Sequence, residues 1–96
     1  MTRANASVDE RVKAAVRTIP EGYVMTYGDI ARRLGLKTAR QVGTVLARGS
    51  DPIPWHRVLH ANGMLVEGLS AEQSRLLRSE RIEVHRGRVN LKQYRW

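Results

Sequence analysis

Four segments of the chain carry apolar residues at helical spacing, and each follows a serine or threonine that has an acid or amide three residues later. This pattern is typical of a helix start, because the hydroxyl accepts a hydrogen bond from the backbone N–H three residues on. It predicts helices that begin at Ser7, Thr26, Thr38 and Ser70, with Glu10, Asp29, Gln41 and Gln73 as the reciprocal partners. We expect these helices to end at Pro20, at Gly35, near Gly49 and around Arg81.

Shorter apolar stretches follow the third helix and suggest small β elements. Residues 53–59 and 63–66 are compatible with extended backbone, and the Ala61-Asn62-Gly63 segment between them predicts a turn. Near the C-terminal end, residues 82–84 and 89–91 flank Arg86-Gly87-Arg88, which predicts a small hairpin with a basic tip.

The second and third predicted helices are separated only by Gly35, Leu36 and Lys37, a spacing typical of a helix-turn-helix. The basic hairpin further along suggests a wing. We therefore predict a mainly helical fold with small β elements, a winged helix-turn-helix, in one domain that spans residues 1–96 with its core at about 7–91. The third helix would contact DNA. Its outward positions are small apart from Arg40, which allows close approach to nucleic acid, although tight packing on a neighbouring helix predicts the same pattern.

Charge narrows the classes of partner. The 96 residues include 17 Lys and Arg against 9 Asp and Glu, which gives a net charge of +8. The excess is concentrated in residues 32–57 and 75–96, and most of the cations are arginine. Because the guanidinium forks onto phosphate and stacks on bases, this composition favours a nucleic acid over an anionic membrane surface or an acidic protein.

Several features are expected to be absent. The sequence contains no cysteine, which excludes disulfides, thiolate metal sites and a cysteine nucleophile. His60 and His85 lack the spacing of a metal site and are interpreted as surface or turn residues, so we expect no metal and no cofactor. No run approaches the roughly 20 apolar residues of a membrane span, and no apolar stretch follows residues 1–6. We expect a soluble cytoplasmic protein, nucleoid-associated if bacterial.

Two segments together resemble a known family. The first runs from Ile19 to Ala31 and is followed by Arg40-Gln41-Val42-Gly43, and the second is Pro54-Trp55-His56-Arg57-Val58 with Asn62-Gly63 after it. Over roughly residues 8–85 they are similar, in order and spacing, to the DNA-binding and active-site domain of O6-alkylguanine-DNA alkyltransferases. In that family a cysteine that accepts the alkyl group stands at the position of Trp55. The chain is therefore identified as a member of the alkyltransferase-like proteins, which lack the transfer activity.

The chemistry of position 55 supports this interpretation independently. Alkyl transfer needs a soft anionic nucleophile such as a thiolate, and an indole ring cannot replace it. Trp55 can instead line a pocket and pack against a flat base or its alkyl group. A tryptophan buried in the core is the alternative.

The resemblance implies roles for residues on the second and third helices. Tyr27 would press on the phosphate 3′ to the target and rotate the nucleotide out, and Arg40 would fill the gap left in the duplex. The alternatives are a tyrosine packed beside the first helix and a solvated surface arginine. The predicted DNA-binding and flipping residues are Thr26, Tyr27, Thr38, Ala39, Arg40, Gln41 and Gly43.

The resemblance also implies a pocket for the flipped base, lined by Tyr27, Trp55, Val58, Val66 and Leu69. His56 and Glu80 match the pair that activates the cysteine in the enzyme; without a nucleophile we expect them to form structural hydrogen bonds, with Arg57 bracing the loop. Residues 66–70 depart from the family's loop, so contacts to the alkyl group are not transferred. The match is also ambiguous at Ser50-Asp51.

The implied function is non-enzymatic recognition of O6-alkylguanine in double-stranded DNA. Such a protein would shield the lesion from alkyltransferase and direct it to nucleotide excision repair proteins, and we expect a monomer with no membrane association. A sequence-specific winged-helix transcription regulator is the alternative, although the small outward face of the third helix leaves few side chains to reach base edges. A base glycosylase that uses Glu80 or Asp51 comes third.

Overall fold

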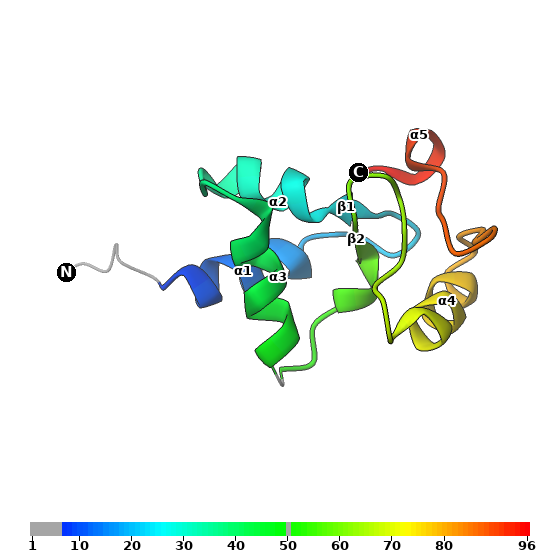
Figure 1. Cartoon of the computed structure of the whole chain (residues 1–96), viewed down its shortest axis with the longest axis horizontal. Coiled ribbons are helices and arrows are strands. Elements are labelled where there is room, and N and C mark those ends of the chain that lie inside the picture. Colours follow the sequence, from blue (N-terminus) through cyan, green and yellow to red (C-terminus); the bar gives the residue numbers. More distant parts are fainter. Residues whose placement is uncertain (1–6, 50) are drawn as a thin grey trace.

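The computed structural model describes residues 7–49 and 51–96; the expectations for residues 1–6 and for Ser50 lie outside these ranges. Helices α1 to α3 lie at one end of the chain's structure and α4 and α5 at the other, with the two strands between them (Figure 1). The elements are α1 (Val8–Arg17), β1 (Met25–Thr26), α2 (Tyr27–Leu34), α3 (Ala39–Arg48), the 3-10 helix η1 (Trp55–Arg57), β2 (Val58–Leu59), α4 (Ser70–Ser79) and α5 (Leu91–Tyr94). None of the helices in the described ranges is long and apolar enough to cross a membrane.

The first two helices form with the caps that the sequence predicts. In α1 the hydroxyl of Ser7 accepts the N–H of Glu10 at 3.1 Å, and the Glu10 carboxylate accepts the N–H of Ser7 at 3.4 Å. In α2 the reciprocal bonds between Thr26 and Asp29 are both 3.0 Å long. Gly35 ends α2 with a φ of +70°, a conformation that costs glycine little because it has no Cβ.

Helices α3 and α4 also form as predicted, but without the capping hydrogen bonds predicted for them. Thr38 is the N-cap of α3, yet its side chain accepts no capping hydrogen bond. The N-cap of α4 is Leu69, so Ser70 is already helical, and Gln73 is fully buried and bonded to other segments. Helix α4 ends before Arg81, whose left-handed φ of +67° cannot continue it.

Helices α1, α2 and α3 pack around a shared apolar core that includes Val12, Val16, Ile30, Val42 and Val45, all nearly inaccessible to solvent. The short link between α2 and α3 makes them the predicted helix-turn-helix. Burial of one side of α3 leaves Arg40, Thr44 and Ala47 exposed on the other.

The two short strands are parallel, with Met25 opposite Val58 and Thr26 opposite Leu59. All four side chains are buried, and they join the helical core to a second core formed by the C-terminal half of the chain. Strand β1 was not predicted from the sequence. Extended backbone was expected across residues 53–59, but only the last two form a strand, because residues 55–57 form η1.

The C-terminal hairpin is smaller than predicted. His85 and Arg88 exchange backbone hydrogen bonds of 2.9 and 3.1 Å around Arg86-Gly87, and this is the whole hairpin. The segment after it pairs instead with the predicted turn, since the N–H of Val89 donates to the carbonyl of Gly63 at 2.9 Å. A Cβ on Gly63 would lie 2.3 Å from the Val89 carbonyl oxygen, so this close approach requires glycine.

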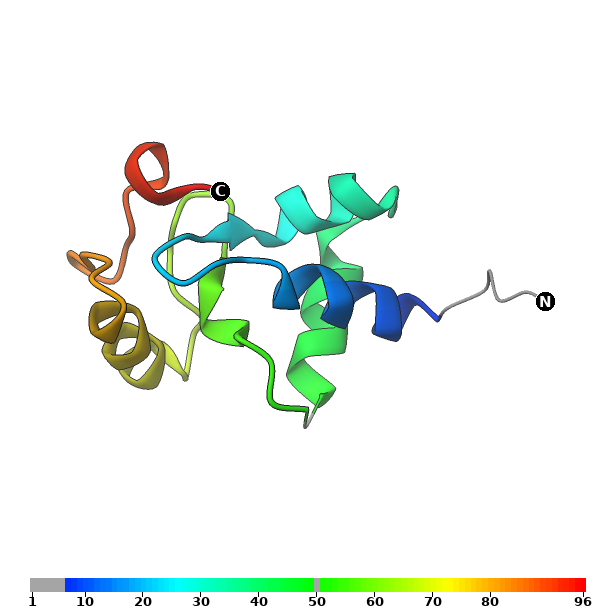
Figure 2. The ribbon, with the colours of Figure 1, turned by 180° about the vertical axis from the view of Figure 1, so that it is seen from behind.

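The C-terminal tail packs beside β1 in both views of the ribbon (Figures 1 and 2). The N–H of Val24 donates to the carbonyl of Tyr94 at 2.9 Å, and the N–H of Trp96 donates to the carbonyl of Val24 at 2.8 Å. The guanidinium of Arg33 lies 5.0 Å from the centre of the Trp96 ring, within the range of a cation–π contact. The sequence alone does not indicate whether this tail is ordered, and the structure shows it docked.

Candidate nucleic-acid interface

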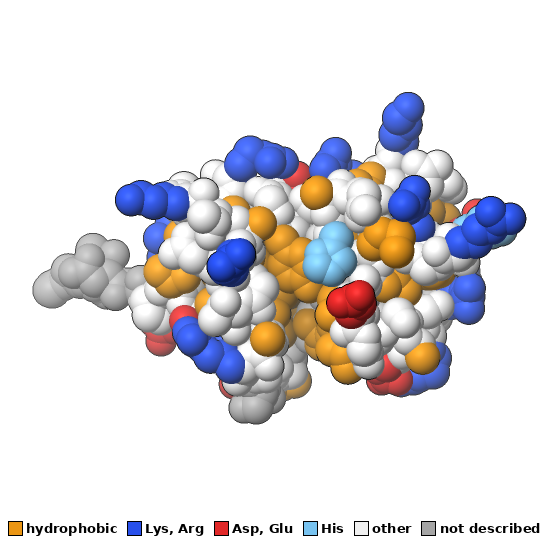
Figure 3. Space-filling view, in the orientation of Figure 1, with side chains coloured by type: hydrophobic (Ala, Val, Ile, Leu, Met, Phe, Trp, Pro, Cys, Tyr) orange, Lys and Arg blue, Asp and Glu red, His pale blue; other side chains and the backbone are white. Residues whose placement is uncertain are grey.

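An open groove of about 620 Å³ runs along the exposed side of α3. Apolar side chains and a histidine are exposed in the middle of one face of the molecule, an acidic side chain adjoins the histidine, and Lys and Arg side chains lie toward the edges of the face (Figure 3). Apart from Arg40, the residues that α3 contributes to the groove are small, so the helix backbone is accessible. The groove is lined by Tyr27, Gly28, Ala39, Arg40, Gly43, Thr44, Ala47, His60 and Ala61.

A more enclosed and mainly apolar cavity of about 400 Å³ adjoins this groove. The two share Tyr27, Gly43 and Ala47 as lining residues. The cavity is lined by Tyr27, Gly43, Leu46, Ala47, Gly49, Trp55, Val66 and Leu69. The structure therefore brings together four of the five residues predicted for a base pocket, from α2, η1 and the 66–69 segment.

Val58, the fifth predicted pocket residue, does not line the cavity. It belongs to β2, pairs with Met25 and is completely buried in the helical core. The prediction was wrong because the parallel pairing of the strands turns this side chain inward. Leu46, Ala47 and Gly49 line the cavity instead, although the sequence analysis did not select them.

Tyr27 lies at the boundary between groove and cavity, as the first residue of α2. Its side chain is half-buried, and burial raises the pKa of its hydroxyl. A Cβ built on Gly43 would lie 4.0 Å from the edge of the Tyr27 ring, an ordinary van der Waals distance, so this part of α3 lies beside the ring.

The other residues predicted to contact DNA divide into two groups. Thr38, Ala39, Arg40 and Gln41 are exposed at the start of α3, and Arg40 makes no ion pair with any acidic residue in the described ranges. Thr26 differs from the prediction, since it is 2% exposed and its hydroxyl caps α2. Thr26 therefore has a structural role in the cap of α2, and its side chain is not available to a ligand.

Glu80 connects three segments through a cluster of hydrogen bonds. Its carboxylate lies 2.7 Å from Nε2 of His56 and accepts hydrogen bonds from Nε and Nη2 of Arg57 at 2.9 and 2.7 Å. The N–H of Gly22 donates to the same carboxylate at 3.3 Å, and Arg57 also donates to the carbonyl of Ile19 at 2.8 Å. The cluster holds η1 against the turn after α1 and the end of α4.

This cluster keeps the Glu80 carboxylate ionised at pH values far below those at which a carboxyl group ordinarily takes up a proton. Burial alone would raise the pKa, but the hydrogen bonds from Arg57, His56 and the N–H of Gly22 outweigh it and lower the pKa to about 2. The side chains of Glu80, His56 and Arg57 are only 9%, 12% and 16% exposed, so the charges are screened weakly by solvent.

Gln73 is a structural residue of the site that the sequence analysis assigned only to a helix cap. Its Nε2 donates to the carbonyls of His56 and Val58 at 3.1 and 3.0 Å, and its Oε1 accepts the N–H of Val66 at 2.7 Å. Because Val66 and Trp55 both line the cavity, Gln73 holds two of its walls together. One feature of the sequence could have revealed this role: Gln73 is a polar residue four positions before Leu77, and so lies on the apolar face of its helix.

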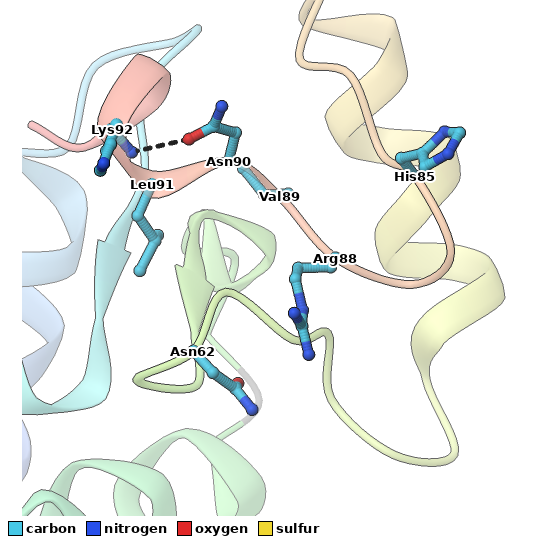
Figure 4. A pocket seen from close by; sticks show the side chains of 7 residues that line it. All are labelled: Asn62, His85, Arg88, Val89, Asn90, Leu91 and Lys92. Atoms are coloured by element: carbon cyan, nitrogen blue, oxygen red, sulfur yellow. Dashed lines mark hydrogen bonds between the residues drawn. The ribbon is translucent and has the colours of Figure 1, made fainter.

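Another hollow, of about 420 Å³, lies between the 62–64 turn and the C-terminal segment (Figure 4). Both of its asparagine side chains are engaged locally: Oδ1 of Asn90 accepts the N–H of Lys92 at 3.0 Å, and Oδ1 of Asn62 accepts the N–H of Met64 at 3.1 Å. It shares no lining residue with the groove or the cavity. Across the described ranges, no cluster of three His, Asp or Glu side chains has the arrangement of a metal site.

Comparison with known proteins identifies related sequences. The family model described as 6-O-methylguanine DNA methyltransferase, DNA binding domain, matches residues 7–82. The chain is 40% identical over 96 residues to the DNA base-flipping protein of Escherichia coli (strain K12), a match that covers 94% of the chain and 74% of the relative. It is 36% identical over 98 residues to alkyltransferase-like protein 1 of Schizosaccharomyces pombe, a match that covers 90% and 91% of the two chains.

Solved structures agree with these relationships. The crystal structure of S. pombe Atl1 in complex with damaged DNA containing O6-carboxymethylguanine matches with a TM-score of 0.86 at 33% identity, covering 92% of this chain and 93% of that one. The Mycobacterium tuberculosis protein OGT in complex with DNA matches with a TM-score of 0.71 at 33% identity, covering 79% and 49%. These matches confirm the predicted fold class.

Proposed function

The chain belongs to the family of the 6-O-methylguanine DNA methyltransferase DNA-binding domain, and we propose that it recognises O6-alkylguanine in double-stranded DNA without removing the alkyl group. One observation carries the proposal: a cavity bounded by Tyr27 and Trp55 adjoins the α3 groove in a chain that contains no cysteine. The names of the relatives, DNA base-flipping protein and alkyltransferase-like protein, support the same interpretation.

In the proposed complex α3 enters the minor groove of the duplex. Its small residues Ala39, Gly43 and Ala47 let the backbone approach the DNA, and Arg40 stands in the first turn, where recognition helices commonly contact DNA. Flipping a nucleotide costs a few kcal/mol and costs least for a damaged base. Tyr27 would push the nucleotide out and Arg40 would occupy the space it leaves.

The cavity is suited to hold the flipped base. Its volume of about 400 Å³ lies in the range of small-molecule pockets. The indole of Trp55 offers a flat apolar surface for stacking, and Leu69, which is 50% exposed, borders the cavity. In the family motif Trp55 takes the position of the cysteine, so the alkyl group has no acceptor and remains on the DNA.

Because the alkyl group is not removed, the lesion remains a ligand for the protein. We propose that the protein, acting as a monomer, shields the alkylguanine from alkyltransferase and passes it to nucleotide excision repair proteins. A duplex whose base is held in the cavity would be marked by the bound protein itself.

The direct test is equilibrium binding to one duplex that carries either guanine or O6-methylguanine at its centre, followed by recovery of the DNA and measurement of its mass. We expect much tighter binding to the lesion, with the methyl group still on intact DNA. Equal binding to both duplexes would contradict the proposal and favour a sequence-specific regulator. Release of the free base would instead indicate a glycosylase.

Substitution of Tyr27 separates steric pushing from hydrogen bonding. Tyr27→Ala is expected to weaken binding to the lesion duplex about 10-fold, whereas Tyr27→Phe, which keeps the ring, is expected to cost less than about 3-fold. Tyr23→Ala is the matched control, because Tyr23 is an exposed tyrosine that lines neither the groove nor the cavity. Equal losses for the alanine and phenylalanine variants of Tyr27 would assign the effect to the hydroxyl.

Trp55→Cys is expected not to restore rapid alkyl transfer. A new thiol would face a cavity whose other wall, residues 66–70, differs from the loop of the enzyme family, so the lesion would not be held for attack. The measurement is the mass of the variant after incubation with the O6-methylguanine duplex, with the unsubstituted protein as the control. Gain of a methyl group within seconds by the variant would show that position 55 alone decides the activity.

A further inference from the structure

We propose that His60 is a positioning residue for base flipping, whose imidazole holds the Tyr27 ring at the boundary between the groove and the cavity. The ring centres of the two residues lie 5.3 Å apart with the planes tilted by 44°, a geometry typical of favourable aromatic pairs. The DNA-binding consequence of this inference rests on the proposed function, whereas the contact itself does not.

The parallel sheet accounts for this contact. Thr26 of β1 stands opposite Leu59 of β2 in the last pair of the sheet. Tyr27 and His60 are the residues that directly follow the two strands, so the same register places them side by side. Thirty-three positions separate them in the sequence, which is why the sequence analysis interpreted His60 only as a surface or turn residue.

The backbone of His60 is fixed although its side chain is exposed. Its N–H donates to the carbonyl of Met64 at 3.1 Å, and its carbonyl accepts the N–H of Gly63 at 2.8 Å. Gly63 is itself held by its close contact with Val89. The imidazole therefore projects from a well-anchored turn and can support a neighbouring ring.

The Tyr27 ring is held from two sides. The Tyr27 side chain packs against the helical core, and His60 contacts it from the turn after β2. A side chain that displaces a nucleotide must resist the opposing force of base stacking, so it needs such support. His60 also lines the groove, which places it where it can act on Tyr27 while DNA is bound.

The first arm of the test compares His60→Ala with two other variants. His60→Ala is expected to weaken binding to the O6-methylguanine duplex about 3- to 10-fold, the range of one lost aromatic pair, and to change binding to the guanine duplex less than about 2-fold. His60→Phe, which restores a flat ring, is expected to recover binding. His85→Ala is the matched control, because it removes an exposed histidine that does not line the groove.

A double-mutant cycle distinguishes positioning from direct contact with DNA. If His60 acts through Tyr27, His60→Ala should have no further effect in a Tyr27→Ala background. A loss of the same size in both backgrounds would mean that His60 contacts the DNA itself and would overturn the inference.

The second arm uses the free protein and requires no lesion binding. The ring protons of Tyr27 lie in the ring-current field of His60, so their NMR signals should shift in His60→Ala and stay in place in His85→Ala. Unchanged Tyr27 signals in His60→Ala would overturn the inference. If the unsubstituted protein showed no preference for the lesion, the proposed function would fail while this arm still decided whether the imidazole of His60 contacts the Tyr27 ring.

Discussion

Arg40→Ala is expected to weaken binding to an O6-methylguanine duplex by about 10- to 100-fold, the range associated with loss of one stacked base. The guanidinium is exposed in the first turn of α3, lines the groove beside Tyr27 and has no ion-pair partner among the described residues. In the proposed complex it fills the space of the extruded nucleotide, a role that exists only when a base is flipped. Binding to the guanine duplex should therefore fall much less.

The measurement is the dissociation constant for both duplexes over a range of salt concentrations. A residue that only neutralises a phosphate would lower the slope of log affinity against log salt by about one and weaken both duplexes alike. Arg48→Ala is the control from the same helix, since Arg48 is exposed and pairs with Asp9 at 2.8 Å. Equal losses on lesion and normal DNA for Arg40→Ala would refute the gap-filling role.

Glu80→Gln is expected to lower the free energy of unfolding by about 3 kcal/mol, as removal of one partner from a buried ion pair does. The substitution keeps the shape of the side chain but leaves the guanidinium of Arg57, which is 16% exposed, without its counter-charge. The whole free energy of unfolding of a domain of this size is only about 5–14 kcal/mol. Urea unfolding at neutral pH measures the difference. Glu72→Gln, which removes an exposed carboxylate paired with Arg75, is expected to have no measurable effect.

The same cluster predicts how stability depends on pH. The pKa of Glu80 is lowered in the folded protein from 4.5 to about 2, so its contribution is complete above pH 4.5 and is lost as the pH falls toward 2. The stability difference between the unsubstituted protein and Glu80→Gln should therefore narrow by roughly 2 kcal/mol between pH 7 and pH 3. A difference that stays constant over this range would show that the carboxylate charge is not the stabilising feature.

Local interactions account for the parts of the fold that could be predicted. The capping boxes of α1 and α2 join residues three apart, and Gly35 ends α2 through its own backbone preference, so side-chain identity is sufficient. The helix-turn-helix follows from the same signals, because a short link leaves two amphipathic helices few ways to bury their apolar faces. In α4 the same cap pattern failed, since Gln73 has better partners from distant segments than its own helix start.

The motif around Trp55 and the helix start at Tyr27 were visible in the order of residues, but the cavity between them was not. It exists because β1 and β2 pair in parallel, which buries Val58 and brings Tyr27 beside His60. Such contacts join positions more than thirty residues apart, and no periodicity or short motif encodes them. They form only when the two hydrophobic cores pack together. The residue types and local elements of this site could therefore be predicted from the sequence, whereas its walls and its supporting side chains were set by tertiary packing.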